Sequence, residues 1–253
     1  MPEGDTIFRT ARTLQRALGG EVVKRFVTVL PVLARVDDQS PIAGQTIVRV
    51  HAVGKHLLID FSGGLTLRTH MRMNGSWHIY RTGERWQRPR DDMRIVIETG
   101  TFVAVGFNIP VAEFTTDTPQ LGPDLLGESF DMNEALRRVR ERSSEEIGNV
   151  LLNQQVIAGI GNIWKSESLH AAGVDPFRRV ADLDDATIIN ILTIARKQLR
   201  ASANATSRVR HSVYQGKLCR KCGTKIEYRK QGEDVRGTWW CPRCQGPPPT
   251  RDR

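Results

Sequence analysis

Four cysteines near the end of the chain form two C-x2-C pairs, and this pattern restricts the fold more than any other feature of the sequence. Eighteen residues separate the pairs, and the chain contains no other cysteine: Cys219, Cys222, Cys241 and Cys244. Two thiolates three residues apart can bind one metal ion, and a hairpin between the pairs would return the second pair to the first. We therefore predict a zinc ribbon with one structural Zn2+ ion per chain.

The alternative for these cysteines is a pair of disulfides or four unpaired thiols. Disulfides persist in oxidising compartments, and no secretory signal is recognisable at the start of the chain. We therefore expect a reducing, cytoplasmic compartment and a metal site.

Positive charge is concentrated just before and within the cysteine region. The 253 residues include 37 Lys and Arg against 28 Asp and Glu, which gives a net charge of +9 and an isoelectric point near 9.8. Residues 200–230 contain nine basic side chains and one acidic side chain, Glu227. A basic run that leads into a zinc ribbon favours a nucleic-acid surface over an ordinary solvated face. A membrane partner is not expected, because no apolar run approaches the ~18 residues of a membrane span.

Hydrophobic periodicity divides the chain into a strand-rich half and a helical half. A helix is predicted at the start, with Ile7, Ala11, Leu14 and Leu18 on one stripe and Gly19-Gly20 ending it. Short alternating segments then predict seven strands, at 21–29, 46–53, 56–61, 65–71, 76–80, 93–98 and 101–107. Helical spacing in the second half predicts four helices, at 134–142, 145–153, 163–172 and 184–201.

These patterns predict an α+β protein with an N-terminal β-sandwich flanked by helices and a C-terminal helical domain that carries the zinc ribbon. The predicted boundaries are the β-sandwich domain at 1–121, a linker at 122–132, the helical domain at 133–216, the ribbon at 217–245 and a disordered tail at 246–253. A cleft between the two domains is the default place for chemistry.

The N-terminus offers a candidate nucleophile. The sequence begins Met1-Pro2-Glu3-Gly4, and removal of Met1 would leave Pro2 with a free secondary amine. An α-amine has a reference pKa of about 7.7–8.0, so near neutral pH part of it can attack an aldehyde-like carbon and form an iminium. Glu3 is placed for general acid–base work on a sugar. Many chains begin Met-Pro, so this dipeptide alone proves nothing.

Together with segments far along the chain, this N-terminus resembles the formamidopyrimidine-DNA glycosylase and endonuclease VIII family of bifunctional DNA repair enzymes. The matching segments follow the family's order over essentially the whole chain: Gly54-Lys55-His56-Leu57-Leu58, Thr69–Trp77, Leu121–Leu126, Gly159-Ile160-Gly161-Asn162-Ile163-Trp164, and Arg236 before Cys241. The resemblance implies a helix–two-turn–helix element, damaged DNA as the partner, and base excision followed by β,δ-elimination. We expect a nucleoid-associated monomer that needs no diffusible cofactor.

The resemblance also implies roles for single residues. Lys55 resembles the family's hairpin lysine, and at the tip between two strands it could hold a phosphate or lower the amine's pKa; an ordinary surface lysine is the alternative. Asn162 begins a helix after a glycine-rich turn, where free N–H groups favour a phosphate; a plain helix N-cap is the alternative. Arg236 resembles the ribbon arginine, whose guanidinium suits a phosphate, while Trp239 and Trp240 are expected in the ribbon core.

Two further residues lie in the segment that resembles the family's lesion-face loop. His70 is expected to contact a phosphate, with a buried structural histidine as the alternative. Met73 is expected to enter the space left when a damaged nucleotide leaves the duplex, with a core methionine at a strand end as the alternative. Arg72 and Asn74 are possible co-inserters.

Three features depart from the family pattern, and the second and third of them favour the endonuclease VIII branch and oxidised pyrimidines. Thr6 stands where many relatives carry glutamate, residues 106–110 lack the Arg-x-Phe arrangement of the formamidopyrimidine enzymes, and the segment 202–218 is short for a loop that closes over oxidised guanine. Two alternatives stay open. One is the purine-directed branch, and the other is a non-enzymatic zinc-ribbon DNA-binding protein, which would leave Pro2, Glu3 and Lys55 unexplained.

Overall fold

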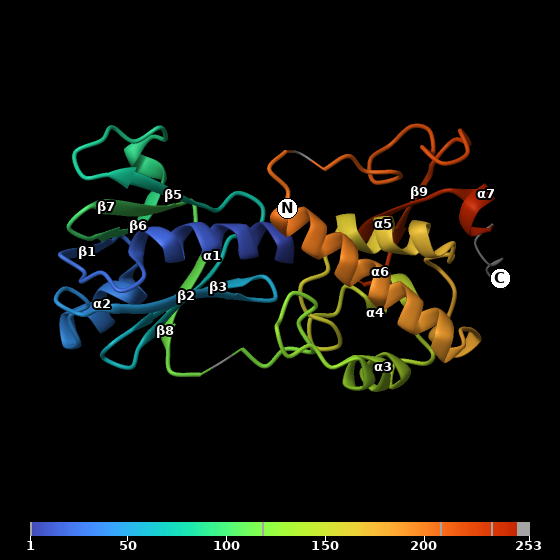
Figure 1. Ribbon diagram of the computed structural model, residues 1–253, viewed down its shortest axis with the longest axis horizontal. Helices are drawn as coiled ribbons and strands as arrows, with labels where there is room; N and C mark the ends of the chain where they lie inside the picture. The colour runs from blue at the N-terminus through green and yellow to red at the C-terminus, as the bar shows by residue number, and fades with distance from the viewer. Residues whose placement is uncertain (1, 118, 208, 234, 247–253) are drawn as a thin grey trace. The chain divides into compact units, whose positions relative to one another are not determined.

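The computed structural model describes residues 2–117, 119–207, 209–233 and 235–246 (Figure 1). The chain divides into two compact units. The first unit contains Pro2 and residues 6–119, and the second contains Glu3–Asp5 and the chain from Gln120 onward. The three residues Glu3–Asp5 therefore belong with the second unit although they directly follow Pro2 near the start of the chain. Arg208 and most of the predicted tail, residues 247–253, lie outside the described residues.

The first unit contains two four-stranded antiparallel sheets. One has the strand order β1-β6-β7-β5 and the other β2-β3-β4-β8. The strands are β1 (Arg25–Thr28), β2 (Ile47–Val53), β3 (His56–Phe61), β4 (Thr66–His70), β5 (Ser76–Arg81), β6 (Met93–Glu98), β7 (Phe102–Phe107) and β8 (Val111–Thr115). The helices are α1 (Gly4–Leu18) and α2 (Pro31–Gln39), with a 3-10 turn, η1, at Arg90–Asp92.

One hydrophobic core joins both sheets to α1. The stripe Ile7, Ala11, Leu14 and Leu18 is buried in the same cluster as residues of both sheets, among them Phe26, Ile95, Ile97, Ile47, Leu57 and Ile59. Burying a whole face of each sheet against the other and against a helix is the arrangement that alternating strands require. The predicted β-sandwich with a flanking helix is confirmed.

Most first-unit elements match their predictions, and two were missed. The predicted strand at 21–29 is observed only as β1, and α2 and β8 were not predicted. Helix α2 buries a single residue, Leu33, so it has almost no apolar stripe to recognise. Strand β8 has no fully buried residue. Its place in the sheet comes from pairing with β4, which local sequence does not encode.

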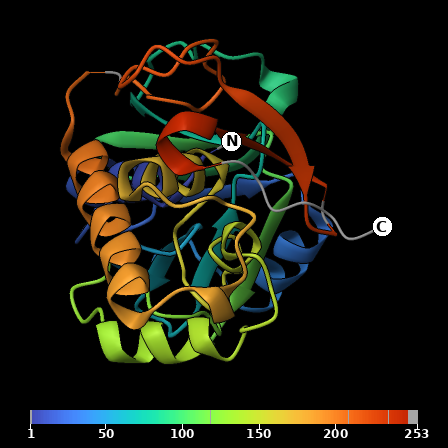
Figure 2. The same cartoon turned by 90° about the vertical axis from the view of Figure 1, so that its right-hand side faces the viewer.

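The second unit is helical up to the ribbon. Its helices are α3 (Met132–Arg140), α4 (Ile147–Val150), α5 (Asn162–Ala172) and α6 (Asp185–Asn204), with a 3-10 turn, η2, at Val180–Asp182. The ribbon consists of the hairpin β9 (Glu227–Gln231) and β10 (Arg236–Trp240), followed by α7 (Pro242–Gln245). The predicted helix at 145–153 is realised only as α4. Figure 2 shows α5 (yellow) between α6 (orange) and the ribbon (red).

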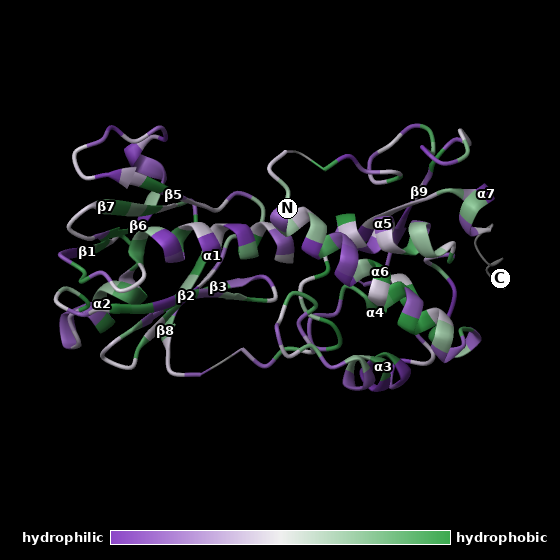
Figure 3. Ribbon diagram, viewed as in Figure 1, coloured by the Kyte–Doolittle hydropathy of each residue, from purple (hydrophilic) through white to green (hydrophobic). Residues whose placement is uncertain are grey.

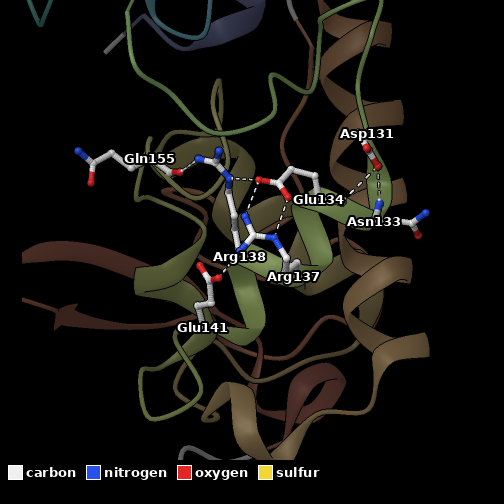
Figure 4. Close-up of polar contacts among 7 residues, drawn as sticks. All are labelled: Asp131, Asn133, Glu134, Arg137, Arg138, Glu141 and Gln155. Atoms are coloured by element: carbon white, nitrogen blue, oxygen red, sulfur yellow. Dashed lines mark hydrogen bonds and ion pairs between the residues drawn. The ribbon is translucent and has the colours of Figure 1, made fainter.

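Helix α3 holds the loop that leads to α5. Most of α3 is hydrophilic (Figure 3), and only Ala135 and Val139 are buried. Its N-cap is Asp131, whose carboxylate accepts hydrogen bonds from the backbone N–H groups of Asn133 and Glu134 at 2.8 and 3.2 Å (Figure 4).

The basic side chains of α3 are tied to acids and to that loop. Arg138 donates to the carbonyl of Gln155 at 2.7 Å and to the carboxylate of Glu134 at 2.6 Å (Figure 4). Hydrogen bonds from Arg137 and Arg138 lower the pKa of Glu134 to about 2. Both arginines are paired within the second unit, and Arg138 also holds the backbone at Gln155, four residues before the glycine-rich turn that begins at Gly159.

No helix in the described ranges combines the length and apolar character needed to cross a membrane.

Candidate active site and metal centre

The carboxylate of Glu3 is held by the first turn of α5. One oxygen accepts hydrogen bonds from the backbone N–H groups of Gly161 at 3.0 Å and Trp164 at 3.2 Å, and the other accepts from Ile163 at 2.7 Å. Glu3 is 1% exposed. Helix N-termini carry unpaired N–H donors and a positive partial charge. Glu3 therefore supplies the side-chain cap that Gly161, the N-cap residue, lacks, and three backbone N–H groups fix its carboxylate.

The glycines of the turn before α5 allow the N-terminal segment to pack closely against that turn. The N–H of Gly4 donates to the carbonyl of Gly159 at 2.9 Å. A Cβ atom on Gly4 would lie 2.9 Å from the Cα of Gly159, and one on Gly161 would lie 2.3 Å from Cδ of Glu3. Both distances are too short for any larger residue at these positions.

This arrangement corrects one prediction. The N–H groups at the start of α5 were expected to be free for a phosphate, and three of them bind Glu3 instead. The glycines do allow a close backbone approach, but the approaching backbone is the chain's own N-terminus.

Asn162 joins the start of α5 to the ribbon. Its Nδ2 donates to the carbonyl of Gly237 at 2.6 Å, and Gly237 follows Arg236 in β10. The helix N-cap is Gly161, so the N-cap alternative for Asn162 is wrong. Arg236 is exposed at the first residue pair of the hairpin, opposite Gln231. Asn162 and Arg236 are thus brought together within the second unit.

A buried polar relay fastens the ribbon to α5. Lys165 is 0% exposed, and its Nζ donates to Oγ1 of Thr238 at 2.6 Å. Thr238 donates to Oε1 of Gln231 at 2.8 Å, and Nε2 of Gln231 donates to Glu146 and to the carbonyl of Pro176, each at 2.8 Å. The Thr238 hydroxyl hydrogen and both Nε2 hydrogens of Gln231 have acceptors, and such pairing is what makes a polar network stable inside a protein.

The pKa of Lys165 falls to about 7. Burial is the main cause, and the charge of Arg236 adds to it, while the carboxylates of Glu3 and Glu146 oppose the fall. The side chain therefore loses its charge near neutral pH.

Lys165 should make the stability of the protein rise with pH. Between the folded pKa of about 7 and the unfolded value of 10.5 the unfolded chain binds the extra proton. Relative to Lys165→Met, the wild type should gain up to about 1.4 kcal/mol of unfolding free energy per pH unit from pH 7 to 9. Urea denaturation at pH 7, 8 and 9 measures this. Lys197→Met, which removes an exposed lysine of α6, is the control, and parallel profiles for wild type and Lys165→Met would contradict the prediction.

Two candidate residues of the first unit lie near each other. Lys55 follows Gly54 in the two-residue turn between β2 and β3 and is 9% exposed, so the alternative of an ordinary surface lysine is wrong. His70 ends β4, and its ring packs edge-on against His56 with centroids 5.1 Å apart. Burial lowers the pKa of His70, and the charges of Arg72 and Lys55 lower it further. His70 is therefore neutral at pH 7 and accepts the Arg72 N–H through Nδ1 at 3.1 Å.

Met73 lies on an exposed turn between β4 and β5. Its side chain is 64% exposed, so the alternative of a core methionine is wrong. The turn is closed by the N–H of Gly75, which donates to the carbonyl of Met71 at 2.8 Å. Arg72 has a φ of 45°, a left-handed conformation that is costly for a residue with a Cβ atom and recurs at functional sites.

The four cysteine sulfurs form one cluster. All four lie within 4.8 Å of one another, and none is in a disulfide, so the disulfide alternative is wrong. The sulfur atoms of Cys222 and Cys241 lie 3.5 Å apart, and those of Cys219 and Cys244 lie 3.9 Å apart. A tetrahedral ion with Zn–S bonds of about 2.3 Å places its ligands about 3.8 Å apart. Four thiolates with this spacing fit Zn2+.

Aromatic rings build the ribbon core. Trp240 is 2% exposed and packs edge-on against Phe177 with centroids 4.9 Å apart. Trp239 is half-buried and lies 4.7 Å from the ring of Tyr214 and 4.9 Å from that of Tyr228. The prediction that both tryptophans belong to the ribbon core is confirmed.

Sequence reasoning missed the polar residues buried on α5. Glu167 is 5% exposed and accepts from the N–H groups of Ser212, Val213 and Tyr214 at 2.7–2.9 Å, so it fixes the short segment before Cys219. Lys165 and His170 are likewise buried. The sequence did contain a signal for this. The polar residues of α5 do not form one continuous face, so the helix cannot expose all of them to solvent at once.

Comparisons with known proteins agree over nearly the whole chain. The family described as formamidopyrimidine-DNA glycosylase N-terminal domain matches residues 1–107, and formamidopyrimidine-DNA glycosylase H2TH domain matches residues 121–211. A probable endonuclease 8 2 of Streptomyces coelicolor is 37% identical over 99% of this chain and 96% of its own length. The DNA-(apurinic or apyrimidinic site) lyase Nei2 of Mycolicibacterium smegmatis is 34% identical over 97% of this chain and 99% of its own.

A solved structure shares the fold. The Lactococcus lactis formamidopyrimidine-DNA glycosylase, crystallised non-covalently bound to DNA containing an AP site, aligns with a TM-score of 0.83 over 96% of this chain and 99% of that one. The identity is 22%, so this likeness establishes the fold alone.

Proposed function

The chain belongs to the formamidopyrimidine-DNA glycosylase and endonuclease 8 family of DNA glycosylases and AP lyases, and from that premise we propose that it excises oxidised bases through a Schiff base on Pro2. The observation that carries the proposal is the fixed carboxylate of Glu3. Three N–H donors hold it, and Pro2 is bonded directly to the same residue. A nucleophile tethered to a fixed acid–base group needs little further ordering before reaction.

The proposed reaction begins at the Pro2 nitrogen, which attacks C1′ of the damaged nucleotide with its lone pair. The bond from C1′ to the base breaks, and the base leaves with that electron pair and takes up a proton. Glu3 accepts the proton released by the Pro2 nitrogen and passes it to O4′ as the C1′–O4′ bond opens. C1′ is then joined to the nitrogen as an iminium.

Strand cleavage follows from the iminium. Loss of a C2′ proton forms a double bond between C2′ and C3′ and expels the 3′ phosphate. Loss of the C4′ proton then expels the 5′ phosphate, and water hydrolyses the iminium to free Pro2. These are the β- and δ-elimination steps, and they leave a gap with phosphate ends.

The DNA backbone is proposed to be held by Lys55, His70, Asn162 and Arg236. The exposed guanidinium of Arg236 supports this role, and its charge carries no sequence information. Four cysteine thiolates are proposed to bind one Zn2+ ion as a structural site, since all four ligands are protein atoms. The ion would stabilise the hairpin that bears Arg236.

Arg236→Ala should weaken binding to all DNA sequences alike. Each phosphate contact releases about one counterion, so the slope of log affinity against log salt should flatten by roughly one unit. Fluorescence anisotropy from 50 to 200 mM salt measures it. Arg35→Ala removes an exposed arginine of α2 and the same charge, and it should leave the slope nearly unchanged. A changed sequence preference with an unchanged slope would remove Arg236 from this role.

Oxidised pyrimidines are the proposed substrates. Residues 107 and 109 are Phe and Ile, each at most 1% exposed, so no Arg-x-Phe pair is presented there. Met73, whose apolar side chain is exposed, is proposed to enter the space that the damaged nucleotide leaves in the duplex. The segment before Cys219 is short and pinned by Glu167, which limits a loop over a bulky purine.

Excision of thymine glycol should therefore exceed excision of 8-oxoguanine from otherwise identical duplexes. Single-turnover rates on both substrates measure this, and a duplex with a pre-formed abasic site normalises for lyase competence. Faster release of 8-oxoguanine would assign the chain to the purine-directed branch.

A further inference from the structure

His170 lies at the cysteine cluster but comes from outside the ribbon. It sits in the last turn of α5, is 4% exposed, and places its Nε2 3.2 Å from Sγ of Cys219. A sulfur acceptor at this distance is within hydrogen-bond range. The histidine is not itself a member of the group of side chains that can surround one ion.

Two of the other cysteine sulfurs have polar contacts from within the ribbon. Sγ of Cys241 accepts the N–H of Cys244 at 3.4 Å, and Sγ of Cys222 lies 3.3 Å from Oγ1 of Thr224. Cys219 differs because its partner is a side chain of a helix forty-nine residues earlier in the sequence. The contact therefore joins α5 to the cysteine region, and it also touches a proposed zinc ligand.

We propose that His170 is a positioning residue of the zinc centre, which donates its Nε2 hydrogen to the Cys219 thiolate and fastens the ribbon to α5. The inference rests on the zinc site proposed above. A zinc-bound cysteine is deprotonated, so Cys219 can only accept, and the hydrogen must reside on the imidazole. Donors of this kind orient metal ligands and spread their negative charge.

Helix α5 then has a fixed partner at each end. Its first turn binds the Glu3 carboxylate, and its last turn binds Cys219 through His170. Both attachments lie on the same eleven-residue helix. Losing the His170 contact should therefore loosen the ribbon before it disturbs Glu3, which keeps its own three donors.

The test measures metal binding rather than DNA cleavage. His170→Phe keeps an aromatic ring and removes the donor, whereas His170→Gln keeps an N–H donor. Zinc affinity, measured by competition with a chromogenic chelator, should fall about 10- to 100-fold in His170→Phe and recover largely in His170→Gln. The thiolate-to-metal charge-transfer band of the Co2+-loaded protein should shift in His170→Phe alone.

His211→Phe is the matched control, since His211 lies in the same unit and packs against Trp164 and Tyr214 instead of a cysteine. It should bind zinc as the wild type does. Wild-type affinity in His170→Phe, or an equal loss in His211→Phe, would overturn the proposal.

A second measurement needs no variant. Nitrogen-15 chemical shifts of the histidine ring in the zinc-loaded wild type should show the hydrogen of His170 on Nε2, and a hydrogen on Nδ1 alone would overturn the proposal even if His170→Phe does not fold. Metal analysis of the wild type separates the two hypotheses. Protein without zinc contradicts the zinc site itself, while protein with zinc and the wrong tautomer contradicts only the role of His170.

Discussion

Strand cleavage and borohydride cross-linking are expected to fall by about 10³-fold or more when an N-terminal extension leaves Pro2 in a peptide bond. An amide nitrogen has no available lone pair, and loss of a nucleophile costs on this scale or beyond it. Gel assays on a duplex with an abasic site measure both activities. The control is the same extended protein after a protease removes the extension and restores a free Pro2, which should recover wild-type cleavage. An extended protein that cleaves at the wild-type rate would exclude an N-terminal nucleophile.

Glu3→Gln should separate the two activities. Without an acid–base group, release of an intact damaged base should fall about 10²- to 10⁴-fold, while some cleavage should survive at a pre-formed abasic site because the aldehyde already exists there. Gln also replaces one acceptor oxygen with a donor that faces the N–H groups at the start of α5. Single-turnover rates on a lesion and on an abasic site measure the split.

Asp5→Asn is the matched control for this variant. Asp5 is also a buried carboxylate of the N-terminal segment, 6% exposed, and it accepts the hydroxyl of Ser202 at 2.5 Å. Asn can keep that bond through its carbonyl oxygen, so base release should stay far closer to the wild type. Equal loss in both variants would mean that Glu3 acts only by holding the segment in place.

Periodicity and turn residues made most of the fold predictable. Alternating apolar and polar residues predicted the strands of the sandwich, and the apolar stripe of α1 predicted its buried face. Both patterns follow from the local geometry of strands and helices. Helix α2 and strand β8 were missed since each has too little buried surface of its own to leave a pattern. The clustering of the four cysteines was predictable, since two C-x2-C pairs match the ligand spacing of a single metal site.

The interior of the second unit was much less predictable. Glu3 and Gly161 are 158 residues apart in the sequence, and nothing local to either indicates that one caps the helix of the other. The same holds for Lys165 with Thr238 and for His170 with Cys219, which are tertiary pairs between polar residues. A count of basic residues also does not show where each side chain lies. Arg229 belongs to the basic run, yet its guanidinium carbon lies over the ring of Phe177, 3.6 Å from the centroid.

The proposed chemistry takes place on the amine of residue 2. Borohydride reduction of the wild-type protein on abasic-site DNA, followed by proteolysis and mass spectrometry of the cross-linked peptide, tests it most directly. We expect DNA attached to the nitrogen of Pro2 at the start of the processed chain. DNA attached instead to the side-chain amine of Lys55 would contradict it.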